Sequence, residues 1–172
     1  MLANLAWLVI VSIGLTACGK KPVSQGNLQR TNLAPGTGAA AEVVLAAWQQ
    51  EDKTAAMARF LETDWSARPL FTPGSAMALS ETQWAALPNQ DRESKRGPLE
   101  AQAGEFTSLV VAVLKAGQDA AANNDPVLAR KHFNALKQFG EAVDRPDFTE
   151  IVRMFGRAAK KGADREMEKL PK

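Results

Sequence analysis

Cysteine, histidine and tyrosine are almost missing from this chain of 172 residues, which has one cysteine, one histidine and no tyrosine. A single cysteine excludes an intramolecular disulfide, so Cys18 has no cysteine partner within the chain. A single histidine excludes metal sites built from several imidazoles, and any Ser–His–Asp or Cys–His arrangement would depend on His132 alone. No acidic pair is set apart by an apolar setting, and no glycine-rich phosphate loop follows a strand. We therefore predict no metal, no cofactor and no catalytic residues, and hence a protein that is not an enzyme.

Charge is missing from the N-terminus and nearly balanced elsewhere. The 21 basic and 19 acidic side chains give a net charge of +2, and residues 1–17 carry none of them. Lys20, Lys21 and Arg30 are the only charged residues within 18–41. The rest of the chain is therefore slightly acidic and lacks the basic field that nucleic-acid binding requires. We expect no nucleic acid among its partners.

One long apolar run stands near the start of the chain. Residues 5–17 (LAWLVIVSIGLTA) carry no charged side chain. As a helix this run would rise about 20 Å, which is short of the roughly 30 Å hydrocarbon core of a bilayer. Its length is typical of the apolar region of a secretory signal peptide rather than of a permanent span. The run ends in Leu15-Thr16-Ala17-Cys18.

This four-residue motif resembles the lipobox of bacterial lipoproteins. The resemblance implies that the Cys18 thiol receives a diacylglyceryl group, that a signal peptidase removes residues 1–17, and that the new amino group is acylated. It also implies a stable anchor in a lipid bilayer, since two or more acyl chains hold a protein on a membrane. An Asp after the cysteine would favour the inner membrane, whereas this chain has Gly19, so we expect the outer membrane, facing the periplasm. Residues 1–4 contain no Lys or Arg, which leaves open a plain N-terminal anchor or a signal cleaved without lipidation.

Behind the motif the composition changes twice. Residues 18–38 are rich in Gly, Pro, Ser, Asn and Thr without apolar periodicity, which predicts a disordered tether. Over 39–172 apolar residues recur with the helical period, and no convincing strand is present. We predict an all-α domain of five to six helices in antiparallel hairpins, arranged as a small bundle or a short helical array.

Capping residues and prolines predict where the helices begin and end. Asp125-Pro126 and Asp144 with Pro146 have the cap-and-proline pattern of helix starts, and Ser80 with Gln83 has the pattern of a capping box. A charged loop, partly helical at most, is expected over 89–97. An irregular connection over 65–75 should place Trp65, Leu70 and Phe71 across the core. The expected helices cover 39–50, 52–63, a short stretch around Trp84, 98–123, 126–143 and 146–170.

A spacing of Asp, Ala four residues on and Phe eight residues on occurs twice, over 52–60 and 125–133. It is similar to the second helix of a tetratricopeptide-like hairpin, in which a small residue lets helices approach and an aromatic ring fills the groove. The full 34-residue consensus is missing, and generic helical packing explains the spacing equally well.

Apolar and basic residues alternate along the last helix. Phe148, Ile151, Val152, Phe155 and Ala159 are expected in the core, opposite a basic face that consists of Arg153, Arg157, Lys160, Lys161 and Arg165. This face could bind lipid phosphates, lipopolysaccharide or an acidic partner. Alternatively it is a solvated surface balanced by Glu150, Asp164 and Glu166.

Two further residue types allow a structural and a functional interpretation. His132 lies between Leu128 and Leu136 on an apolar helix face, where a hydrogen-bonded core histidine is favoured over a catalytic one. Trp48, Trp65 and Trp84 can anchor an interface or stack on sugars, although packing in the core or at its rim is favoured. The sequence therefore predicts a non-catalytic interaction or scaffold module that binds another envelope protein. The alternative is a binding module for lipid, glycan or a small hydrophobic ligand.

Overall fold

Helices account for all the regular secondary structure in the part of the chain that the structure describes. The computed structural model describes residues 39–50 and 52–171, which belong to one compact unit. Within these ranges there are six α-helices, one 3-10 helix and no strand. They are α1 (Ala40–Gln49), α2 (Lys53–Glu62), η1 (Ala76–Ala78), α3 (Glu81–Ala86), α4 (Asn89–Ala122), α5 (Pro126–Val143) and α6 (Glu150–Met167). The predicted all-α class is confirmed, while the expected signal peptide and tether lie outside the described residues.

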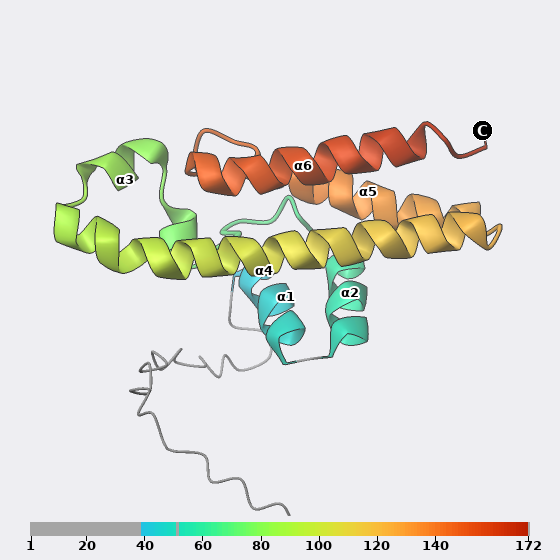
Figure 1. Ribbon diagram of the computed structural model, residues 1–172, viewed down its shortest axis with the longest axis horizontal. Helices are drawn as coiled ribbons and strands as arrows, with labels where there is room; N and C mark the ends of the chain where they lie inside the picture. Colours follow the sequence, from blue (N-terminus) through green and yellow to red (C-terminus); the bar gives the residue numbers. More distant parts are fainter. Residues whose placement is uncertain (1–38, 51, 172) are drawn as a thin grey trace, which may run out of the picture. The chain divides into compact units, whose positions relative to one another are not determined.

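The three long helices pack together, and a helical hairpin lies against them (Figure 1). α5 packs along both α4 and α6, and α4 also contacts α6. The chain reverses after α4 and again after α5, so α4 and α6 run in the same direction. α1 and α2 form an antiparallel hairpin that contacts α4 and α5. None of the described helices is both long and apolar enough to cross a bilayer.

The predicted caps explain several helix ends. Ser80 and Gln83 form the expected capping box in front of α3, with each side chain accepting the backbone N–H of the other residue. α4 ends where Asn124 adopts a left-handed conformation (φ 59°), which asparagine tolerates better than most residues. The Asp125 N–H then bonds the carbonyl of Ala120 at 2.9 Å. The carboxylate of Asp125 accepts the Leu128 N–H at 2.9 Å, and Pro126 follows in the first turn of α5.

The long helix begins earlier than the sequence predicted. The expected charged loop over 89–97 is instead the start of α4, and Pro98 lies inside the helix. A proline inside a helix loses one backbone hydrogen bond and costs about 3 kcal/mol. The residues in front of it are mostly good helix formers, and Asp91 lies in the first turn, where an acidic residue is favourable. The prediction was wrong because it treated one proline as a helix start.

The last helix begins later than predicted. Asp144 is the C-cap of α5 rather than the start of the next helix, and α6 begins only at Glu150 with Thr149 as its N-cap. The first N–H of α6, at Glu150, donates to the carboxylate of Glu81 at 3.0 Å. This partner is 69 residues away in sequence, so the local pattern could not predict it.

Aromatic rings fill the core between the helices. Phe106, Phe139 and Phe155 stack with centroids 5.7–5.9 Å apart and thereby join α4, α5 and α6. Trp65 comes from the irregular segment, as predicted, and lies 4.8 Å from the rings of both Phe60 and Phe139. Its indole N–H donates to the Phe60 carbonyl at 3.1 Å. Leu70 and Phe71 are also buried, which confirms the expected position of this segment.

The three residues of the Asp–Ala–Phe spacing have the same positions in α2 and in α5: the Asp caps the helix, and the Ala and Phe are buried. Asp52 and Asp125 both cap their helices through the N–H three residues on. The alanine four residues on and the phenylalanine eight residues on are fully buried in both helices, as Ala56, Phe60, Ala129 and Phe133. The tetratricopeptide-like resemblance itself stays a prediction.

Candidate functional site

The five residues of the predicted basic face all lie on α6. Two of them belong to an ion-pair network near the start of the helix. Arg153 and Arg157 both lie 3.5 Å from Asp144, and both also pair with Glu150. Glu150 was predicted as a partner, whereas Asp144, at the end of α5, was not. The two carboxylates balance the two guanidinium groups, so this half of the face has no charge excess.

In the second half of α6 the basic side chains pair with other carboxylates, and one carboxylate serves two cations. Lys160 lies 4.0 Å from Glu141, and Arg165 lies 3.1 Å from Glu166. Lys169 also donates to Glu166 at 2.8 Å, and this hydrogen bond lowers the pKa of the Glu166 carboxyl against the opposing effect of burial. Glu166 therefore partly neutralises two cations.

Two residues depart from the expected balance. Asp164 was expected to balance the basic face, but its carboxylate lies 3.4 Å from Lys137 of α5. Lys161 has no carboxylate within 4.0 Å among the described residues. The expected balancing by acidic residues therefore holds for Glu150 and Glu166, and it leaves Lys161 as an exposed cation.

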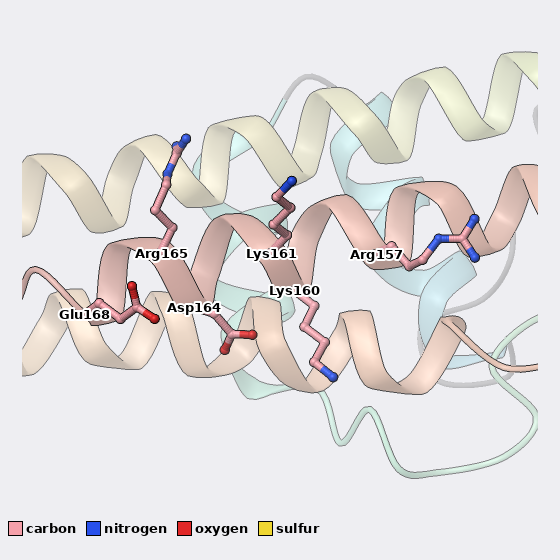
Figure 2. A pocket seen from close by; sticks show the side chains of 6 residues that line it. All are labelled: Arg157, Lys160, Lys161, Asp164, Arg165 and Glu168. Atoms are coloured by element: carbon pink, nitrogen blue, oxygen red, sulfur yellow. The ribbon is translucent and has the colours of Figure 1, made fainter.

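The basic residues border a surface hollow of about 360 Å³ (Figure 2). Its lining consists of Arg157, Lys160, Lys161, Asp164, Arg165 and Glu168. Figure 2 shows Lys161 and Arg165 pointing toward α4, while Lys160 and Asp164 point toward α5. The structure thus brings four of the five predicted residues to one hollow, in which four cations outnumber two carboxylates.

A second hollow was not predicted from the sequence. It has a volume of about 430 Å³ and lies between α2 and α5, lined by Leu61, Val127, Arg130, Lys131, Asn134, Ala135 and Gln138. Below, these seven residues are called the α2–α5 groove. Its residues from α5 recur every three or four positions along one helix face. The sequence shows only one part of this groove, because Val127 interrupts the polar side of an otherwise amphipathic helix, whereas Leu61 comes from another helix.

Five large apolar side chains among the described residues are exposed, and one of them lines a hollow. They are Val111, Val127, Leu128, Ile151 and Met154. Val127 belongs to the α2–α5 groove and is 79% exposed, and Leu128 follows it in the first turn of α5. Ile151 and Met154 lie on α6, and Val111 lies on α4. Leu128 and Ile151 were predicted to be buried, but they are 41% and 39% exposed, because the next residues along the chain, Ala129 and Val152, face the core in their place.

His132 has a structural position. Its side chain is buried, and its Nδ1 lies 2.8 Å from the carbonyl of Leu128, one turn earlier in α5. The interpretation as a hydrogen-bonded core histidine is confirmed. No group of three or more His, Cys, Asp or Glu side chains in 39–50 and 52–171 is arranged to hold a metal ion.

The three tryptophans of the domain pack as predicted. Trp48 and Trp65 are buried, and Trp84 is half-buried against the core. The Lys53 ammonium group lies over the Trp48 ring, 3.8 Å from the ring centroid. Cys18, the predicted lipidation site, lies outside the described residues.

No protein-family model matches the chain, and neither a curated protein nor a solved structure matches it. Its function has to follow from the chemistry of the Cys18 motif and of the two surfaces.

Proposed function

We propose that the chain is a bacterial lipoprotein, held on the outer membrane by acyl groups on Cys18, whose helical domain binds a segment of another envelope protein. The motif Leu15-Thr16-Ala17-Cys18 after an uncharged apolar run supports the anchor. The absence of a second cysteine supports it as well, because Cys18 then has no disulfide partner in the chain. In this proposal the protein has a non-catalytic role in the periplasm.

The α2–α5 groove is the observation that carries the binding role. Leu61, Val127 and Ala135 give it apolar walls for side chains of a bound segment. Asn134 and Gln138 are one helical turn apart and exposed, and their amides can each donate to and accept from a peptide backbone. Basic side chains at the same groove favour a segment with an acidic residue or a carboxyl terminus.

A protein segment fits this groove better than a small hydrophobic ligand. Small-molecule pockets usually enclose most of the ligand and are lined mainly by apolar and aromatic side chains. The phenylalanines of the described residues lie instead in the packed core, and the lining of the α2–α5 groove contains no aromatic residue. Binding of lipid, glycan or a small hydrophobic ligand is the alternative.

Replacement of Cys18 by Ser tests the anchor. We expect the wild-type protein to pellet with membranes, to resist alkaline extraction and to carry the mass of a diacylglyceryl group. The Cys18→Ser protein should lack this mass and should not be retained through lipid. A wild-type protein without the lipid mass would refute the anchor.

Photo-crosslinking in intact cells tests the groove. A photoreactive residue in place of Gln138, inside the groove, should give one discrete adduct with an envelope protein. The same residue at Asp119, which is exposed on α4, is the matched control and should give none. Val127→Asp should remove the adduct from position 138, because the charge is inserted into the apolar wall. An adduct of equal yield from both positions, or one insensitive to Val127→Asp, would contradict the proposed role.

A further inference from the structure

The exposed residues on one side of α6 change from apolar to basic along the helix. Steps of three and four residues place its members on one side of the helix. In chain order they are Ile151, Met154, Ala158, Lys161 and Arg165, all of them exposed. We call this set the α6 ridge. Its first half has two large apolar side chains, 39% and 59% exposed, and its second half has two cations.

α4 extends the apolar part of this surface. Leu114 of α4 borders Gly162 of α6, with its Cδ2 only 3.4 Å from where a Cβ would lie. Val111 is three residues earlier on α4 and is 58% exposed. The close-up shows Lys161 and Arg165 pointing toward α4 (Figure 2). Apolar and basic groups of two helices thus share one exposed surface.

This surface differs from the α2–α5 groove. Ile151, Met154 and Val111 line neither of the two hollows described above. Exposed apolar side chains next to Lys and Arg are the pattern of helices that lie in a membrane interface, with the apolar groups entering the headgroup region. The α2–α5 groove is lined by residues of α2 and α5 alone, so the two surfaces share no residue.

We propose that the α6 ridge and Val111 rest on an anionic phospholipid bilayer, with Lys161 and Arg165 on headgroup phosphates and the apolar side chains in the interface. This inference depends on the proposed anchor. The chain from Cys18 to residue 39 extends at most about 75 Å. An anchored domain is therefore kept at an effective concentration on the order of 1 mM beside the membrane. A weak contact is sufficient to orient the domain and to present the α2–α5 groove to the periplasm.

The experiment follows the environment of the ridge in the lipidated protein. Ala158→Cys introduces the only free thiol once Cys18 is a thioether, and it takes a bimane label. The protein is reconstituted into vesicles of phosphatidylcholine, alone or with an equal amount of phosphatidylglycerol, with brominated acyl chains as quenchers. We expect quenching and a blue shift in the anionic vesicles only. A label at Gln138→Cys in the α2–α5 groove should stay in water in both.

Charge variants connect the contact with the two cations. Each Lys or Arg near an anionic surface strengthens binding roughly fivefold, so Lys161→Gln with Arg165→Gln should weaken the docking equilibrium roughly 25-fold. Arg59→Gln with Lys53→Gln removes the same charge from exposed positions on α2, outside both hollows, and should leave the docking equilibrium unchanged. Circular dichroism verifies that each variant is folded.

The outcomes separate the two proposals. A protein without the lipid mass overturns the anchor and with it the bilayer contact. A lipidated protein overturns the bilayer contact alone if its label at 158 stays in water in anionic vesicles, or if Lys161→Gln with Arg165→Gln has no larger effect than the control pair. The bilayer contact is also overturned if the thiol of Ala158→Cys is protected from labelling in cells but stays in water in vesicles. That result would assign the ridge to an acidic protein partner.

Discussion

The backbones of α5 and α6 approach each other closely at Gly140 and Gly156. A Cβ at Gly140 would lie 2.6 Å from the Gly156 carbonyl oxygen and 2.9 Å from the backbone nitrogen of Lys160. Both obstacles are backbone atoms, so no side-chain rotation can relieve the contact. Gly140→Ala should therefore push α5 and α6 apart.

The expected cost follows from the size of that displacement. Non-bonded heavy atoms are most stable about 3.5–4.0 Å apart, so the helices would have to separate by roughly 1 Å at this point. A gap of that size removes a quarter to a half of the attraction of each contact. If about 40 atom contacts of about 0.15 kcal/mol are affected, the loss is about 1.5–3 kcal/mol. Alanine has a helix propensity about 1 kcal/mol better than glycine, so the net destabilisation should be about 0.5–2 kcal/mol.

Thermal and urea unfolding followed by circular dichroism, in the Cys18→Ser background, can measure this difference. We expect a Tm about 2–8 °C below that of the parent protein. Gly104 in α4 is the matched control, because no heavy atom outside its own helix lies within 4 Å of its Cβ position. Gly104→Ala should raise stability by up to about 1 kcal/mol. If Gly140→Ala were as stable as Gly104→Ala, the close packing of α5 on α6 would be refuted.

Two further predictions concern single side chains. Asp125→Ala should lower the free energy of unfolding by about 1 kcal/mol because it removes the cap of α5, whereas Asp125→Asn keeps an acceptor and should cost less; urea unfolding at neutral pH measures both, and equal losses would contradict the cap. The pKa of Glu166 is lowered from its ordinary value of 4.5, so its carboxylate stabilises the fold fully above pH 4.5, and this stabilisation is lost as the pH falls through the lowered value. Glu166→Gln should therefore be less stable than the parent at pH 7 and approach it in acid, and a stability gap that stays constant with pH would contradict the ion pairs with Lys169 and Arg165.

The helical class could be predicted because its signals are local. Apolar residues at helical spacing and short-range caps such as Ser80 with Gln83 act within a few residues, and the structure contains them as predicted. The two helix starts that were predicted wrongly depend on other causes: one on a proline that the helix tolerates, the other on a residue far away in the sequence. Pro98 is tolerated inside α4, and α6 begins where the distant Glu81 accepts the N–H of Glu150.

The surfaces were predicted less completely than the helices. The basic residues of α6 could be identified because they recur every four positions. Their charge balance could not, since Asp144 approaches Arg153 and Arg157 only after α5 has packed on α6. The α2–α5 groove was missed for a related reason: it combines Leu61 of one helix with residues of another.

The sequence by itself determined that the domain is helical, which face of each long helix is mostly apolar, and that Cys18 follows an apolar run in a lipobox-like motif. These features depend on the order of neighbouring residues and on backbone hydrogen bonds within a turn. The tertiary structure alone decided which cations stay unpaired, which apolar residues remain exposed and where a groove opens. Those properties depend on the distance between helices, and the glycines at the α5–α6 contact show that this distance is set by packing of backbone against backbone.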